Sequence, residues 1–282
     1  MRKRISFISV LTMFLAIGFV IIFSRPVKAA ANGVILKSNR TYAAYDVTGD
    51  GMKDKIRIRA ANQTDDEAYA SLTVSVNGKT AYRLKNTRFY NVIANIYTLK
   101  NGQPFLYLYA PAENGDGPVC ALLKYTNGKF RKILDFTEIM AGYGNHRIGE
   151  VTNLNGNKIV ITESIVSYSL GINAINFTYK YVNGKFVPTS RYGSYKEIYS
   201  ADGSSRYFTV NSDLPAYTRP DATAVNTTLK TGSLTKIIKC ALISGKMYIQ
   251  LECDGEIYWI KALENPPIAD NERQFMEVRY AG

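Results

Sequence analysis

The chain has little of what common catalytic chemistries need. It contains one histidine, three cysteines and one tryptophan among 282 residues. A serine or cysteine triad would have to use His146, which lies in the Gly-rich stretch "AGYGNHRIGE" without a nucleophile motif such as G-x-S-x-G beside it. Histidine-based zinc catalysis needs more histidines than this. We therefore expect His146 to be a loop residue without a catalytic role, and we expect no enzyme.

Long apolar runs are absent after the first 31 residues. At the N-terminus, three basic residues precede an apolar run from Ile5 to Phe23 and a small-residue stretch from Ala29 to Ala31. This layout predicts that residues 1–31 are a secretory signal peptide and that the protein is secreted or held at the cell surface. The alternative is an uncleaved anchor, because a run of 19 residues is close to the ~20 that span a bilayer. No other membrane contact is predicted.

Acidic charge is scarce relative to basic charge. The chain has 35 Lys and Arg against 23 Asp and Glu, for a net charge of +12, and removal of the five basic residues in 1–29 lowers it to +7. A basic exported protein suits an anionic cell wall or membrane surface. The basic residues are scattered along the sequence, so an ordinary solvated surface is the competing interpretation. No nucleic-acid-binding motif accompanies the charge, and we expect no nucleic-acid partner.

Cysteine is too rare for a disulfide framework, since three residues allow at most one bond within the chain. Cys240 and Cys253 lie on two apolar runs joined by "ISGKMY", and a hairpin there would put them on adjacent strands. The other interpretation is that both, together with Cys120, are buried thiols that act as small apolar side chains.

Helix signals are also scarce, whereas short alternating apolar runs separated by Gly-rich turns recur throughout. They predict an all-β protein with strands that include 55–60, 71–76, 105–110, 158–164 and 176–182.

An internal similarity indicates repeated units. "KYTNGKF" at 124–130 is nearly identical to "KYVNGKF" at 180–186, and "VSVNGKT" at 74–80 is a weaker copy for which chance is the alternative. Asn-Gly between two strands favours a two-residue hairpin turn in which both central residues have positive φ. The spacings of 50 and 56 residues predict three β-units over 32–203, as a propeller-like region or another repeated sheet. Because an ordinary propeller has roughly four to eight blades, we expect an open or distorted array, or a partner.

The character of the sequence changes after about residue 200. The connector "YSADGSSRY" contains Gly and Ser, and no Asn-Gly-Lys repeat follows it. We place a domain boundary near Ser204, with a C-terminal domain at 204–265 and a tail at 266–282. Docking of the tail on the body is one option, and the sequence assigns it no role.

The stretch "DVTGDGMKD" at 46–54 has oxygen-bearing residues at alternate positions. Asp46, Thr48, Asp50 and Asp54 offer side-chain oxygens, and Met52 offers its backbone carbonyl. A hard cation such as calcium takes about six to eight oxygens, which alternate residues of a tight loop can supply.

The context of this loop decides which calcium family it resembles. Arg57 stands where a helix-loop-helix calcium hand needs glutamate, and "KIRIR" alternates as a strand does. The loop resembles the calcium-binding hairpin loops of FG-GAP and VCBS repeats, which occur in propeller domains of surface proteins. The resemblance implies one structural calcium ion, because the equivalent turns at 96–104 and 151–158 lack carboxylates. A metal-free polar turn is the competing interpretation.

Four stretches in the C-terminal part resemble the bacterial SH3-like (SH3b) domain, a small barrel common in secreted Gram-positive proteins. They are "LPAYTRP" (214–220), "LKTG" (229–232), "MYIQLE" (247–252) and "DGEIYWIKA" (254–262). Such domains often bind cell-wall peptide or glycan, to which aromatic rings offer flat apolar area with a polar tip. The resemblance makes Tyr217, Tyr248, Tyr258 and Trp259 the contact candidates. Packing of Trp259 and Tyr248 in the barrel core is the alternative.

Together these features predict an exported, non-catalytic binding protein of the cell surface or cell wall, with calcium as its only cofactor. A secreted glycan hydrolase is the first alternative, since the separation of paired carboxylates is not encoded in sequence spacing. An accessory protein of the envelope is the second.

Overall fold

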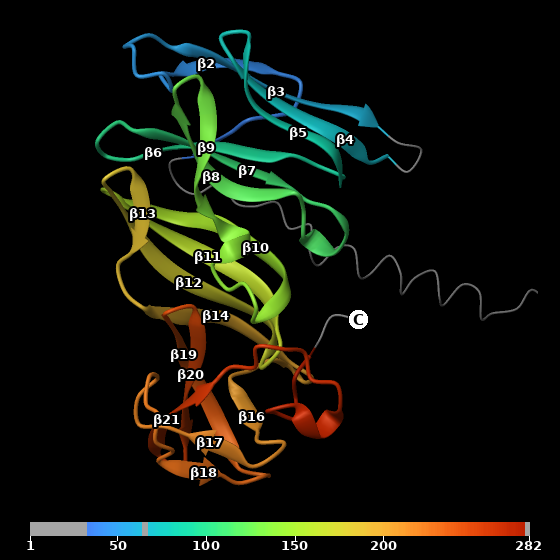
Figure 1. The fold of residues 1–282 in the computed structure, drawn as a ribbon, viewed down its shortest axis with the longest axis vertical. Coiled ribbons are helices and arrows are strands. Elements are labelled where there is room, and N and C mark those ends of the chain that lie inside the picture. The colour runs from blue at the N-terminus through green and yellow to red at the C-terminus, as the bar shows by residue number, and fades with distance from the viewer. Residues whose placement is uncertain (1–32, 64–66, 280–282) are drawn as a thin grey trace, which may run out of the picture.

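The computed structural model describes residues 33–63 and 67–279. The predicted signal peptide, 1–31, lies outside these ranges. Within them the chain forms strands and three short 3-10 helices, so the all-β class is confirmed (Figure 1). No helix in the described ranges is both long enough and apolar enough to cross a membrane.

The N-terminal part forms three successive four-stranded antiparallel meanders, which contain all five strands predicted from the sequence. The first is β2 (Thr41–Tyr45), β3 (Asp54–Gln63), β4 (Tyr69–Val76) and β5 (Lys79–Phe89). The second is β6 (Ile93–Thr98), β7 (Pro104–Ala110), β8 (Val119–Thr126) and β9 (Lys129–Asp135), with β1 (Gly33–Ile35) beside β6. The third is β10 (Gly144–Asn155), β11 (Lys158–Ser167), β12 (Gly171–Val182) and β13 (Lys185–Pro188). Two 3-10 helices, η1 (Glu113–Gly115) and η2 (Phe136–Glu138), lie in the loops that precede β8 and β10.

The three Asn-Gly sites occupy equivalent places in the meanders. Each joins the third strand of its meander to the fourth. The φ angles are 51° and 80° at Asn77 and Gly78, 50° and 78° at Asn127 and Gly128, and 48° and 84° at Asn183 and Gly184. Both central residues therefore have the positive φ of a type I′ turn, whose twist matches that of the flanking strands. The hairpin prediction is confirmed at all three sites.

The meanders stack face to face in a row (Figure 1). Strand β7 shows how the sequence builds this stack, because successive residues of a strand face opposite sides. Leu106 and Leu108 join an apolar cluster shared with the first meander, whereas Phe105 and Tyr107 join the main core shared with the third. The middle sheet is therefore apolar on both faces.

A continuous ladder links the third meander to the C-terminal part. Strand β14 (Tyr192–Ser200) pairs with β12 on one side and with β19 (Leu234–Ile243) on the other, and β20 (Lys246–Cys253) and β21 (Glu256–Lys261) follow. The remaining strands are β15 (Gly203–Ser204), β16 (Tyr207–Thr209), β17 (Leu214–Ala216) and β18 (Thr227–Leu229). Strand pairing thus crosses the boundary predicted near Ser204.

The C-terminal sheet is curled, and Tyr217, the residue after β17, bridges to Trp259 of β21. After the short helix η3 (Asp270–Glu272), the tail docks back on the body. Phe275 bridges to Val210 of the curled sheet, and Val278 bridges to Ser200 at the end of β14. The N–H of Ile172, in β12, donates to the carbonyl of Arg279 at 3.0 Å, so the tail also fastens the third meander to the C-terminal part.

The cysteines are three buried free thiols. Cys240 and Cys253 do lie on adjacent strands, but Cys240 is opposite Ile249 and Cys253 is opposite Thr235. Cys253 is four residues along β20 from the partner of Cys240, about 14 Å along the strand, which is too far for a disulfide. Burial raises the pKa of both Cys120 and Cys240 to about 12. The buried-thiol interpretation therefore describes these residues.

Candidate functional site

The acidic loop joins β2 to β3 at one end of the first meander. Gly49 and Gly51 have φ angles of 79° and 86°, a region that side chains rarely adopt. The turns they make aim N–H groups at Asp46, whose Oδ1 accepts from Gly49 at 2.6 Å and whose Oδ2 accepts from Gly51 at 2.8 Å. Desolvation favours the protonated acid, but the hydrogen bonds that Asp46 accepts, one of them from Thr48, together outweigh it and hold the pKa of Asp46 below its ordinary value.

Asp54 ties the loop to the rest of the meander. Its side chain is 1% exposed. Its Oδ2 accepts the N–H groups of Val47 and Thr48 at 2.7 and 2.9 Å. Its Oδ1 accepts from Nδ2 of Asn77 at 2.6 Å, and Oδ1 of Asn77 accepts the Lys55 N–H at 2.8 Å. The asparagine of the first Asn-Gly turn is thus a partner of the acidic loop, which the sequence did not reveal.

Three of the five predicted calcium ligands meet in the structure. Oγ1 of Thr48 lies 3.3 Å from Oδ1 of both Asp46 and Asp54. Asp50 instead accepts the Met52 N–H at 2.8 Å, and the Met52 side chain is 68% exposed. Oxygens converging from alternate loop residues fit a hard cation. Within the described ranges no group of three or more His, Cys, Asp or Glu is placed to hold a metal ion, so the calcium site stays a prediction.

Three of the four predicted contact residues, Tyr217, Tyr248 and Trp259, form one small apolar cluster. The fourth, Tyr258, packs against the main core instead, because neighbouring strand residues face opposite sides. The cluster therefore lies on the outer face of the curled sheet. Trp259 is 4% exposed, and Tyr217 and Tyr248 are each 7% exposed. Trp259 and Tyr248 are therefore buried, as the alternative interpretation expects, but in a separate cluster rather than in the barrel core.

A more exposed layer covers this cluster. The ring of Tyr192, from β14, lies 5.9 Å from that of Trp259 and is 36% exposed. Nζ of Lys239 lies 4.5 Å from the Tyr192 ring and 5.9 Å from the Trp259 ring, distances at which cations attract aromatic rings. Nζ of Lys261 lies 5.1 Å from the Tyr217 ring.

The strand register places an amide beside these groups, since Gln250 is opposite both Lys239 and Trp259. We call Tyr192, Tyr217, Lys239, Gln250, Trp259 and Lys261 the aromatic face. Sequence analysis missed Tyr192 and Lys239 because only the ladder from β14 to β19 brings them to Trp259.

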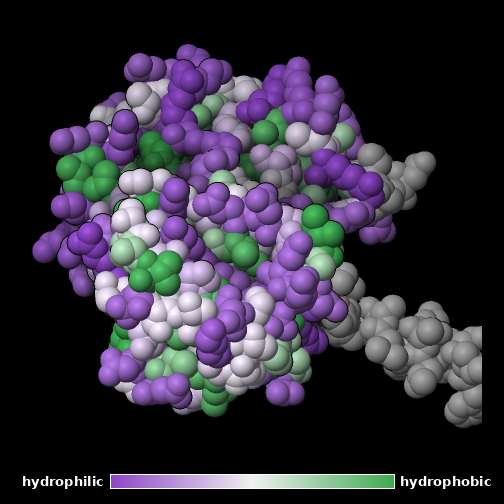
Figure 2. Space-filling model, turned by 60° about the horizontal axis from the view of Figure 1, so that its bottom comes forward, coloured by the Kyte–Doolittle hydropathy of each residue, from purple (hydrophilic) through white to green (hydrophobic). Residues whose placement is uncertain are grey.

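On the face of the molecule that Figure 2 draws, exposed apolar residues are scattered. Figure 2 shows them as separate green patches among hydrophilic residues. Leu234 is 60% exposed, Ile257 46% and Ile268 94%.

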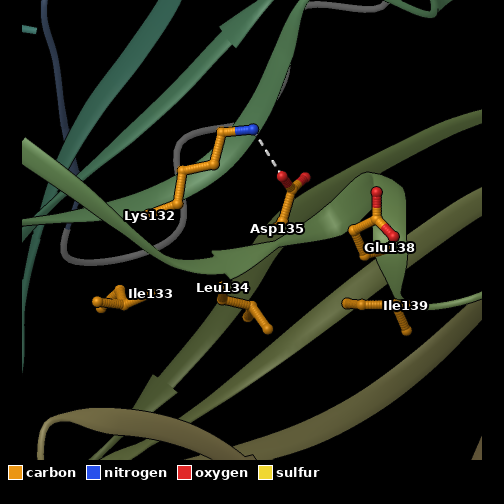
Figure 3. A pocket seen from close by; sticks show the side chains of 6 residues that line it. All are labelled: Lys132, Ile133, Leu134, Asp135, Glu138 and Ile139. Atoms are coloured by element: carbon orange, nitrogen blue, oxygen red, sulfur yellow. Dashed lines mark hydrogen bonds and ion pairs between the residues drawn. The ribbon is translucent and has the colours of Figure 1, made fainter.

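The hollow drawn in Figure 3 is formed by a local turn of the chain, and its charged residues stabilise that turn. It has a volume of about 430 Å³ and is lined by one segment, from the end of β9 into η2. Nζ of Lys132 contacts Oδ2 of Asp135 at 2.6 Å, while Oδ1 of Asp135 accepts the Thr137 N–H at 3.2 Å and caps η2. The charged groups of the hollow therefore serve the local chain turn.

Two observations bear on catalysis. His146 lies in β10, where the ladder with β11 shifts register between Asn145 and Ile148, so the loop prediction for it is wrong. Burial raises the pKa of Glu150, as a glycosidase acid would require, but the charged neighbour that acts on it is Lys196, a cation.

Comparison with protein-family models, curated proteins and solved structures found no match to this chain. The FG-GAP/VCBS and SH3-like resemblances therefore rest on the residues that carry them.

Proposed function

We propose that this chain is an exported, non-catalytic binding protein of the cell surface or cell wall. Its aromatic face would hold wall peptide or glycan, and its acidic loop would hold one structural calcium ion. The observation that supports the proposal best is the juxtaposition of an exposed ring, Tyr192, with Lys239 and Gln250 above the buried Trp259.

The chemistry of this juxtaposition suits a polymer made of sugars and short peptides. The exposed Tyr192 ring offers apolar area to a sugar face, and its hydroxyl offers a hydrogen-bond partner. Lys239 and Gln250 can donate hydrogen bonds to hydroxyl and carbonyl oxygens. Because Trp259 is packed beneath, the site is held rigidly, which lowers the entropic cost of binding.

Cosedimentation with purified peptidoglycan tests the proposal, with the chain from residue 32 onward. The double variant Tyr192→Ala/Lys239→Gln should bind about tenfold more weakly than the wild type, as expected for a central contact pair. Tyr192 and Lys239 are preferable to Trp259 and Tyr248 as targets, because loss of the buried rings would also damage the fold.

The chain provides a matched control. Tyr207 is 52% exposed and has Nζ of Lys236 at 5.9 Å from its ring, so Tyr207→Ala/Lys236→Gln removes the same chemistry outside the aromatic face. We expect this variant to bind as the wild type does. Absence of wild-type retention, or equal losses in the two variants, would refute the proposed role.

The rival activity is glycan hydrolysis. It would be favoured if the wild type released reducing sugar from wall polysaccharide and a single Glu or Asp substitution outside residues 46–54 abolished the release.

A further inference from the structure

The first meander buries only one of its faces. Ile56 and Ile58 of β3 and Leu72 and Val74 of β4 enter the cluster shared with the second meander. The alternate residues of these strands therefore face outward, at the free end of the stack (Figure 1).

This outer face carries two lines of cations with hydroxyl groups between them. Arg57 and Arg59 of β3 and Arg83 and Lys85 of β5 are exposed, and they flank Ser71, Thr73 and Ser75 of β4. The register sets Thr73 between Arg59 and Arg83, Ser75 opposite Arg57, and Ser71 opposite Lys85. We call these seven residues the basic track.

The dimensions of the track follow from strand geometry. The two lines of cations are two strand spacings apart, about 10 Å, and neighbours along one line are about 7 Å apart. No carboxylate occupies a position of the track. In the part of the chain that the structure describes, none of the four cations forms an ion pair, although Nη2 of Arg83 lies 3.4 Å from Oγ1 of Thr80.

We propose that the basic track binds a linear polyanion with phosphodiester groups, which lies along β4 between the two lines of cations. Four like charges repel one another in the free protein, and an anionic ligand relieves that repulsion. The guanidinium groups can each hold a phosphate through two parallel hydrogen bonds. The serine and threonine hydroxyls beneath can donate to the remaining oxygens.

The composition of the track disfavours other anionic partners. Single-stranded nucleic acid is usually bound by aromatic side chains that stack on its bases, and the track has none. A membrane-binding face usually places apolar side chains among its cations, whereas here the central positions are Ser and Thr. Tyr82 and Leu84, the large apolar side chains nearest the track in β5, pack against the buried cluster.

Binding of fluorescent poly(glycerol phosphate) to the chain from residue 32 onward tests this inference. The variant Arg57→Gln/Arg59→Gln/Arg83→Gln/Lys85→Gln should bind at least about tenfold more weakly, and the slope of log K against log salt should fall by about 3 in magnitude, as expected when four phosphate contacts are lost. Unfolding curves of the variant should match the wild type, because all four side chains are exposed.

A control variant removes the same charge elsewhere. Its changes are Lys100→Gln/Lys158→Gln/Lys180→Gln/Lys185→Gln, all at exposed positions outside the first meander. It should keep wild-type affinity and salt slope. Equal losses in the two variants would overturn the inference, since net charge alone would then explain binding, and so would absence of wild-type binding.

Two further experiments distinguish polyanion binding by the basic track from membrane binding and from binding at the aromatic face. Vesicles of phosphatidylglycerol and phosphatidylcholine should bind the track variant and the wild type equally well. The inference would be overturned if the wild type bound vesicles more strongly than the variant did and neither protein bound the polymer. The inference does not rest on the proposed function, because the basic track and the aromatic face share no residue. Tyr192→Ala should therefore leave polymer binding unchanged.

Discussion

Asp50 and Asp54 both belong to the acidic loop, but their surroundings differ. Asp54 is buried and accepts hydrogen bonds from Val47, Thr48 and Asn77, whereas Asp50 is exposed and accepts one from Met52. The first is therefore part of the fold whether or not a metal binds. The second contributes chiefly if calcium does.

Thermal unfolding with calcium and with chelator distinguishes these two roles. Asp54→Ala leaves N–H groups of the loop without an acceptor and should lower the free energy of unfolding by about 1–3 kcal/mol in chelator, and by more in calcium, because Asp54 is also one of the predicted ligands. Asp50→Ala should change it by less than about 0.5 kcal/mol in chelator. In calcium, the wild type should gain about 2.7 kcal/mol at a free concentration one hundred times the Kd, and Asp50→Ala should lose that gain. A wild type that calcium does not stabilise would make the loop a polar turn.

The C-terminal tail acts as a strap between two parts of the sheet. Phe275 is fully buried, with its ring 5.6 Å from that of Phe208. The carboxylate of Glu277 accepts from the N–H and Oγ1 of Thr209 at 2.8 and 2.5 Å. Gly171 is needed beneath it, because a Cβ there would lie 2.1 Å from the carbonyl oxygen of Arg279.

Truncation of Phe275 should therefore be costly. We expect Phe275→Ala to lower the free energy of unfolding by about 3–5 kcal/mol, through lost burial and the cavity left behind. Its neighbour Met276 is 49% exposed, and Met276→Ala should cost less than about 1 kcal/mol. Denaturant unfolding of both variants measures the difference. Similar small costs would mean that the tail is not fastened to the body in solution.

Local elements were predictable where the backbone conformation of a few consecutive residues determines which residue types can occupy them. The Asn-Gly turns are of this kind, since positive φ at two successive positions selects those residues. Pairing between distant strands is not encoded locally. The four cations of the basic track are two pairs that lie far apart in the sequence, and they become neighbours only through the register of β3, β4 and β5, which includes a shift between Val74 and Ser75.

Pairing between distant strands also limited how much of the candidate sites could be predicted from the sequence. The spacing of the oxygen donors in 46–54 was visible, but the hydrogen bond from Asn77 to Asp54 depends on the hairpin that folds β4 back beside β3. Strand alternation alone implies that Tyr258 and Trp259 face opposite sides, so that distinction was available from the sequence. The approach of Tyr192 to Trp259 required the tertiary ladder.

At the scale of the whole molecule, the main hydrophobic core contains residues from both sides of the boundary predicted near Ser204. It includes Tyr107 of the second meander, Ile175 of the third, Ile249 of the curled sheet and Phe275 of the tail. Backbone pairing of β14 with both β12 and β19 crosses the same point. A polypeptide cut there would divide one hydrophobic core and leave β14 with an unpaired edge.

Separate expression of 32–203 and 204–282 tests whether the two parts fold independently. We expect 204–282 to show no cooperative thermal transition, because it loses β14 and the third meander as packing partners. We expect 32–203 to retain a transition at a lower temperature than the full chain, since the cluster between its first two meanders is intact. Mixing the fragments should restore part of the lost stability. If 204–282 instead melted cooperatively at a temperature seen in the full chain, the boundary near Ser204 would separate two autonomous domains.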